Sequence, residues 1–297
     1  MKNVNAIDRI VRLLLAVVFL ELAYFWLAGG WQIASYVAGA VMLATAAIGF
    51  CPLYRFLGMS TAAPSGKAPG AVLLAAASLL LIGVTVGGSY ASAFFTRKLF
   101  LEDFNSMNTF YKQTLFLTGK NERKQALDNY EKLLPAFQEF QKKYTRYQPH
   151  ALKGDAQLPL DFANVAKMLA AVDTLVRSGD LHQAHLDLEK VRPVFQEMFK
   201  RNGFSMLAVA LVEFHDAMEL ALDAANQKDS AKLIGLYPQV SDKLKSVEAE
   251  ANDAEIQDIR GHLDALLVLA KEARTDAMPA KAEMLKSSFV KVYLKRG

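Results

Sequence analysis

The chain has 297 residues, of which 53% are hydrophobic and 22% charged, and its formal net charge is +4. This charge is small and dispersed, and no basic run alternates with aromatic residues, so the composition argues against a nucleic-acid partner. The single cysteine excludes an intramolecular disulfide framework and any cysteine-based zinc or iron–sulfur site.

Two apolar runs follow a polar, basic N-terminus. Residues 10–29 and 31–50 are each about as long as one membrane crossing. The turn between them is short, and Trp26 and Trp31 flank it as interfacial anchors would. A cleavable signal peptide is the competing interpretation, but no small-residue cleavage site follows the first run, and the second run begins almost at once. We therefore expect a membrane-spanning helical hairpin.

A third apolar run occupies residues 69–95, after a loop rich in Gly, Pro, Ser and Thr. The run carries no charge and is longer than the about 18 residues that mark a membrane-spanning candidate. It predicts a third transmembrane helix. The sequence leaves open whether this helix continues unbroken into residues 99–117.

Basic residues indicate the orientation of the three predicted spans. One side of the membrane carries five of them, Lys2, Arg9, Arg12, Arg55 and Lys67. The turn between the first two spans carries none, so the side with the five should be cytoplasmic. Arg97 and Lys98 follow the third span on the opposite side and oppose this orientation, but they are too few to reverse it. We expect a bacterial inner-membrane protein with a cytoplasmic N-terminus and a periplasmic region after residue 98.

Two short motifs border the predicted hairpin. Their residues are Asn5, Asp8, Arg9 and Arg12, then Gly49, Phe50, Cys51, Pro52, Leu53 and Tyr54, followed by Leu57, Gly58 and Thr61. Over residues 1–62 this pattern resembles the YgaP-like inner-membrane transmembrane domain family. The resemblance implies a membrane-embedded helical hairpin, which one family member carries fused to a cytoplasmic rhodanese domain. No rhodanese follows here, so sulfur transfer is not expected.

Three features of the membrane region have alternative interpretations. Glu21 in the first span has an ion or proton role, or it contacts headgroups or a neighbouring helix, and we favour the contact. Gly83 and Gly87 would allow close approach of another helix, within the chain or in a homodimer. Cys51 is a reactive thiol or a packing residue; packing is favoured because no His or Lys lies beside it in the sequence.

After residue 99 the pattern changes to amphipathic helices, with apolar residues three and four apart and no convincing strand. We expect a soluble all-α domain over residues 99–297. An internal repeat supports it, since aligning residues 121–140 with 179–198 superposes Ala126 on Ala184 and Pro135 on Pro193. Both prolines should disturb their helices.

The repeat predicts four antiparallel helical hairpins, over about 103–146, 161–200, 204–250 and 253–296. At the turns of the first three, we expect Gly119, Gly179 and Asn226 to take the left-handed conformation that ends a helix. Asn or Asp should cap the helix that follows. Residues 147–161 are the one long irregular stretch, so the domain forms two lobes or an extended helical array.

Histidines are the only plausible ligands for a metal. His182 and His185 are three residues apart, and His215 has Met218 and Glu219 at helical spacing. Copper through His and Met, or another metal through His and carboxylate, would use such spacing. The favoured alternatives are a solvated helix face for the pair and a core histidine for His215.

Haem is a further possibility, although the chain has no Cys-x-x-Cys-His attachment site. His215 would then need a distant partner, Met198, Met206 or Met284. Methionines at helical spacing are more often core residues.

No nucleophile elbow and no glycine-rich phosphate loop occurs, so we expect no enzyme. The predicted domains are the hairpin (1–62), the loop with the third span (63–98) and the helical domain (99–297). The sequence predicts a membrane-anchored periplasmic binding or scaffold protein for a protein partner or small ligand. The alternative is a metal- or haem-binding protein that uses His215, with or without His182 and His185.

Overall fold

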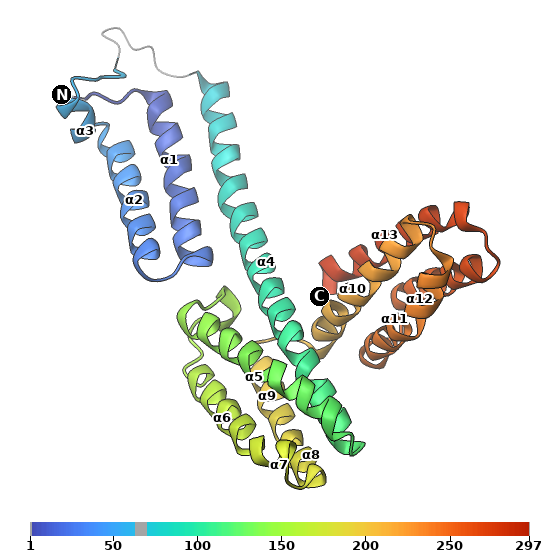
Figure 1. Ribbon diagram of the computed structural model, residues 1–297. Helices are drawn as coiled ribbons and strands as arrows, with labels where there is room; N and C mark the ends of the chain where they lie inside the picture. The colour runs from blue at the N-terminus through green and yellow to red at the C-terminus, as the bar shows by residue number, and fades with distance from the viewer. Residues whose placement is uncertain (1, 63–69, 297) are drawn as a thin grey trace. The chain divides into compact units, whose positions relative to one another are not determined.

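The computed structural model describes residues 2–62 and 70–296, and Figure 1 shows it as a ribbon. Helices are the regular elements of this described part, which contains no strand, so the predicted all-α fold is confirmed. The chain divides into two compact units. Unit 1 comprises Met1–Phe100 and Glu139–Ala156, and unit 2 comprises Leu101–Gln138 and Gln157–Gly297. Lys67, used above to predict orientation, lies outside the described residues.

Unit 1 is built on a hairpin of two antiparallel helices, α1 and α2 (Figure 1). Its elements are α1 (Ala6–Glu21), the π-helix η1 (Leu22–Trp26), α2 (Gly29–Ile48), α3 (Pro52–Phe56), the first part of α4 (Ala71–Gly119), the end of α5 (Arg123–Arg146) and the 3-10 helix η2 (His150–Leu152). Gly29 has a φ of 62°, a left-handed conformation that suits glycine at the tight turn between the two helices.

Two helices in the described part of the chain, α2 and α4, are long and apolar enough to cross a membrane by length and composition. The first predicted span corresponds to α1 and η1 together, which are 16 and 5 residues long. The third predicted span lies in the first part of α4. That helix has 49 residues and continues without a break to Gly119, which answers the question that the sequence left open.

Unit 2 contains the remaining helices, and the division into four hairpins stays a prediction; the last residues of the first predicted hairpin, from Glu139 on, belong to unit 1. The helices of unit 2 are the end of α4, the start of α5, α6 (Leu158–Ala171), α7 (Asp173–Arg177), α8 (Leu181–Glu189), α9 (Val191–Arg201), α10 (Met206–Asn226), α11 (Ser230–Glu250), α12 (Ala254–Lys271), the 3-10 helix η3 (Thr275–Ala277) and α13 (Met278–Arg296). The repeat relationship itself stays a prediction.

Helices α10 to α13 pack around one hydrophobic core. Every helix contributes fully buried side chains to it, among them Phe214, Leu244, Leu263 and Phe289. The rings of Phe214 and Phe289 meet edge to face with centroids 5.6 Å apart. Such pairs add stability beyond the area they bury.

The prediction that Gly119 and Asn226 take the left-handed conformation at their helix ends is wrong. In the first and third turns the left-handed residues are Asn121 (φ 61°) and Lys228 (φ 57°). The reason is that α4 continues through Gly119 and α10 through Asn226, which moves the turn along the chain. Gly119 serves close packing instead, because a Cβ there would lie 3.1 Å from the ring of His185.

The second turn also differs from its prediction. Gly179 is not left-handed, but it turns tightly, and a Cβ there would lie 2.9 Å from the Cα of Leu175. The predicted cap is present, since the Asp180 carboxylate accepts the backbone N–H groups of His182 and Gln183. Both internal prolines are predicted to disturb their helices. The helix is interrupted at Lys190, three residues before Pro193, whereas α5 continues through Pro135.

Candidate functional site

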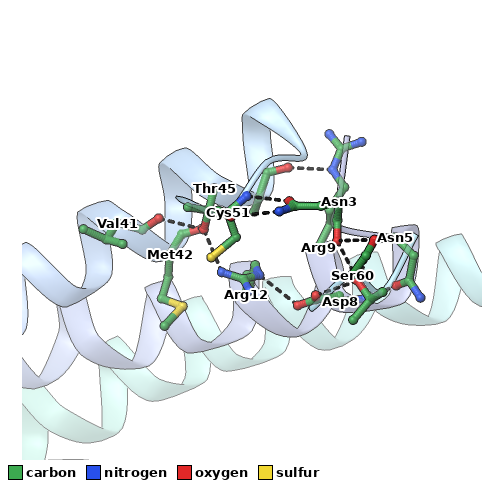
Figure 2. Close-up of polar contacts among 12 residues, drawn as sticks. Asn3, Asn5, Asp8, Arg9, Arg12, Val41, Met42, Thr45, Cys51 and Ser60 are labelled. Atoms are coloured by element: carbon green, nitrogen blue, oxygen red, sulfur yellow. Dashed lines mark hydrogen bonds and ion pairs between the residues drawn. The ribbon is translucent and has the colours of Figure 1, made fainter. Parts of the chain in front are cut away.

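The motif residues of the hairpin form one polar network, which Figure 2 shows in close-up. Asn5 caps α1 by accepting the backbone N–H of Asp8 at 2.8 Å. The Asp8 carboxylate accepts from the Arg12 Nε at 2.8 Å and from the Thr61 hydroxyl at 2.9 Å. Asp8 therefore joins the start of α1 to the segment that follows α3.

The two arginines of the motif bind the end of α2. Arg9 donates from Nε to the carbonyl of Ala46 at 2.6 Å and from its terminal nitrogen to that of Ala47 at 3.2 Å. Arg12 donates to the hydroxyl of Thr45 at 3.0 Å. The last carbonyls of a helix have no partner within it and carry partial negative charge, so cationic donors stabilise them.

Cys51 is buried in this network, with 6% of its surface exposed. Asn3 pairs with its backbone, accepting its N–H at 2.7 Å and donating to its carbonyl at 2.8 Å (Figure 2). Pro52 then begins α3, and the Arg12 guanidinium lies 4.8 Å from the centre of the Tyr54 ring. The geometry agrees with a packing role for Cys51.

Glu21 contacts the neighbouring helix α4. Its carboxylate accepts a hydrogen bond from the Ser89 hydroxyl at 3.0 Å. It also lies against Gly88, where a methyl group would overlap it. Gly83 and Gly87, the predicted pair for close approach, have no atom within 4 Å of a Cβ built at either position. A homodimer through these glycines stays a prediction.

The end of η1 is capped by side chains from elsewhere in unit 1. The carbonyls of Ala23 and Phe25 accept from Gln32 at 2.9 Å and from the Tyr147 hydroxyl at 2.5 Å, and Lys153 donates to the carbonyl of Tyr24. Tyr147 and Lys153 belong to the long irregular stretch predicted at residues 147–161, which in the structure also contains η2 and the start of α6. This stretch is therefore a cap on the membrane hairpin.

The predicted metal ligands of α8 lie in different surroundings. His182 is exposed at the helix start, whereas the Nδ1 of His185 lies 2.9 Å from the carbonyl of Leu115 and packs against the end of α4. Within residues 2–62 and 70–296 there is no group of three or more His, Cys, Asp and Glu side chains that could hold a metal ion.

The His215 ring packs against the rings of both Phe289 and Tyr293, each with its centroid 5.6 Å away, and these two rings also contact each other with centroids 5.1 Å apart. The Asp216 carboxylate, 3.6 Å away, raises the pKa of His215; burial opposes the rise, and Glu219 at 3.7 Å adds to it. Met218 is fully buried in the helical core.

The three methionines predicted as distant haem ligands also have different surroundings. Met198 is fully buried, Met206 lines a cleft described next, and Met284 is half exposed.

A cleft of about 420 Å³ opens in unit 2 between the end of α4, α8, α9 and the start of α10. Its lining is mainly aromatic and aliphatic: Phe104, Tyr111, Leu115, Phe116, Phe195, Phe199, Met206 and Val209, with Asn108, Lys112, His185, Glu189, Arg192, Gln196 and Glu213 as the polar members. The sequence analysis did not identify this site.

The charged members of the lining are paired. The Glu213 carboxylate accepts a hydrogen bond from Lys112 and another, at 2.8 Å, from Lys243. Burial disfavours its charge, but the two lysines outweigh burial and lower the pKa of its carboxyl. Glu189 and Arg192 form a second pair at 3.3 Å.

Two polar side chains from α4 lie deeper among the aromatic residues. The Tyr111 hydroxyl donates to the carbonyl of Leu188 at 2.8 Å, and burial raises its pKa to about 12. Asn108 is 6% exposed, and its side-chain amide makes no hydrogen bond to any described residue. Its amide atoms are not among the fully enclosed side-chain atoms that lack a partner, so they are open to the cleft that Asn108 lines.

A signal for this site exists in the sequence. Phe104, Asn108, Tyr111 and Leu115 follow each other at spacings of three and four, so one face of the helix is apolar apart from an asparagine. The repeat could not identify the cleft, because the site requires α4, α9 and α10 together.

Residues 1–65 match the family model described as inner membrane protein YgaP-like, transmembrane domain. The match covers the hairpin and both motifs, so the resemblance is confirmed for this part of the chain, which carries a membrane-protein module. No curated protein and no solved structure matches the chain.

Proposed function

We propose that the protein is a membrane-anchored, non-enzymatic binding protein that holds a small, mostly apolar ligand in the cleft of unit 2. The cleft is the single observation that carries this proposal. Its volume of about 420 Å³ falls in the range of small-molecule sites, and its lining has their character, apolar walls with a few polar groups.

The energetics of the walls support an apolar ligand. The Phe104 ring meets the rings of Phe195 and Phe199 edge to face, with centroids 4.9 and 4.7 Å away, so the site is held in shape by its own packing. Each Å² of apolar surface that a ligand covers contributes about 25 cal/mol. A preformed site spends little of that gain on ordering side chains.

The proposed orientation has a cytoplasmic N-terminus and a periplasmic helical region. It is supported by the basic motif residues, which follow the positive-inside rule. Arg97 and Lys98, which both lie within α4 just after its apolar part, oppose the rule but are outnumbered by the five basic residues on the other side. A periplasm-specific reporter fused after Gly297 should be active. A reporter active only in the cytoplasm would reverse the orientation.

A photolabelling experiment tests the binding site. The full chain in lipid nanodiscs is exposed to a twelve-carbon hydrocarbon that carries a diazirine, irradiated, and analysed by peptide mass spectrometry. Labelling of α2 peptides reports the probe dissolved in lipid. We expect additional labelling of residues 104–116 and 195–209, which border the cleft.

A filled cleft provides the control. Val209→Trp should abolish labelling at the cleft and leave labelling of α2 unchanged. The matched variant Val268→Trp changes a half-exposed valine of α12 that does not line the cleft, and it should label like the wild type. Cleft labelling that is absent from the wild type, or unchanged by Val209→Trp, would contradict the proposal.

The metal or haem alternative is tested on the same sample. A stoichiometric metal or a Soret band, lost in His215→Ala, would replace the apolar-ligand proposal with a metalloprotein. The His215 ring packs against Phe289 and Tyr293, and among the described residues it belongs to no group of three or more His, Cys, Asp and Glu side chains that could hold a metal, so we expect neither signal.

A further inference from the structure

We infer that the ligand of the cleft is an uncharged amphipathic molecule, an apolar chain or ring that carries one hydroxyl or carbonyl group, and that Asn108 binds this group. The inference rests on the proposed function, because it names the ligand class of the same site. It is carried by the unpartnered amide of Asn108 together with the pairing of the charges around it.

The first step is the position of Asn108. It lines the cleft, its residue is 6% exposed, and the described chain offers its amide no hydrogen-bond partner. A carboxamide has two donor hydrogens and an acceptor oxygen. A hydroxyl can use both kinds of group and a carbonyl can use the donors, so either would supply the hydrogen bonds that the described chain does not.

The second step is the charge of the site. Lys112 is paired with Glu213, which also binds Lys243, and Arg192 is paired with Glu189, so each charge of the lining has an opposite partner. A charged ligand would have to displace one partner of a pair and leave the other uncompensated, which is costly at a partly buried site. A neutral polar group meets no such cost. The apolar part of the ligand then contacts the apolar side chains of the cleft.

The third step is a comparison on the same helix. Asn105 lies one turn before Asn108, is 4% exposed, and both atoms of its amide lack a partner. It does not line the cleft. Asn105 therefore provides a matched control, since its replacement removes an equally buried amide from the same helix but leaves the ligand site unchanged.

The experiment uses three straight-chain diazirine probes of twelve carbons: the hydrocarbon, the primary alcohol and the carboxylic acid. Each is photolysed with the full chain in nanodiscs, and cleft labelling is divided by α2 labelling. This ratio corrects for different partitioning of the probes into lipid. The variants are Asn108→Leu, Asn108→Ala and the control Asn105→Leu.

We expect the alcohol to label the wild-type cleft about 5- to 10-fold more than the hydrocarbon does, the factor that one net hydrogen bond provides. The acid should label it less than the alcohol, because its charge disturbs the paired side chains. Asn108→Leu should lower labelling by the alcohol and raise labelling by the hydrocarbon. A merely damaged cleft would lower both, so this reversal identifies a direct contact. Asn108→Ala should also lose the preference for the alcohol, and Asn105→Leu should keep it.

The possible failures are distinguishable. If the acid labels the cleft best, or if both Asn108 variants keep the preference for the alcohol, the inference is wrong while the cleft remains a binding site. If none of the three probes labels the cleft above the Val209→Trp background, the proposed function fails as well.

Discussion

The polar side chains of the hairpin motif and the two buried asparagines of the unit 2 part of α4 differ in whether the chain supplies them with hydrogen-bond partners. In the hairpin of unit 1, Asn3, Asp8 and Arg12 all have partners within the chain (Figure 2). On the unit 2 part of α4, the buried amides of Asn105 and Asn108 have none. Satisfied networks hold a structure together, whereas a buried group without a partner lowers stability and is retained where it serves something else.

The hairpin and the cleft also differ in their similarity to known proteins. The hairpin with its network matches a known transmembrane domain over residues 1–65. The cleft lies in the part of the chain beyond this match. We therefore expect substitutions in the network to change the stability of the hairpin and the exposure of Cys51, and substitutions in the cleft to change ligand binding.

The largest effect should come from the core of the α10–α13 bundle. Phe214→Ala removes a fully buried ring that packs edge to face on Phe289, and it should lower the free energy of unfolding by about 3–5 kcal/mol. Thermal unfolding followed by circular dichroism checks this. Leu220→Ala, which shortens a half-exposed side chain on the same helix, should change little.

The next effect concerns the motif network. Arg12→Ala leaves the carboxylate of Asp8 without its ion pair and should cost about 3 kcal/mol, because breaking a mostly buried pair strands a charge. The single cysteine offers a direct readout, since a maleimide should label Cys51 faster in this variant than in the wild type. Arg55→Ala, an exposed position, should leave the labelling slow. Equal rates in all three proteins would mean that the network does not protect Cys51.

A smaller effect is expected at the contact between α1 and α4. Gly88→Val places a side chain where the carboxylate of Glu21 lies and should cost about 1–3 kcal/mol through overpacking. Gly83→Val meets no atom within 4 Å and should be neutral. Thermal unfolding in nanodiscs compares the two. Loss of stability in Gly83→Val alone would point to a partner helix at the predicted glycine pair instead.

The smallest effect is the pH dependence of His215. Its pKa is raised in the folded chain by Asp216, so the protonated ring stabilises the fold. This stabilisation is complete below the unfolded pKa of about 6.5 and is lost as the pH rises through the folded value. The melting temperature should therefore fall slightly from pH 6 to pH 8. The fall should become smaller in Asp216→Asn, where Glu219 still favours the protonated ring, and a rise of the wild-type melting temperature with pH would contradict the assignment.

Sequence patterns alone determined the class of the fold and the place of its helices. Hydrophobic runs and helical periodicity depend on neighbouring residues, so residues 31–50 and the bundle after residue 204 were found without a structure. The family motif was visible for the same reason, because Asp8, Arg9 and Arg12 form a short local pattern.

Tertiary structure decided what those helices bring together. Sequence reasoning placed left-handed turns at Gly119 and Asn226, but where a helix ends depends on packing, as the contact of Gly119 with His185 demonstrates. It considered histidines as the site, although their spacing along one helix says nothing about a third ligand from elsewhere. The cleft and the unpartnered amide of Asn108 exist only because α4, α9 and α10 meet. Residues far apart in the chain become one site through packing, which a local pattern does not encode.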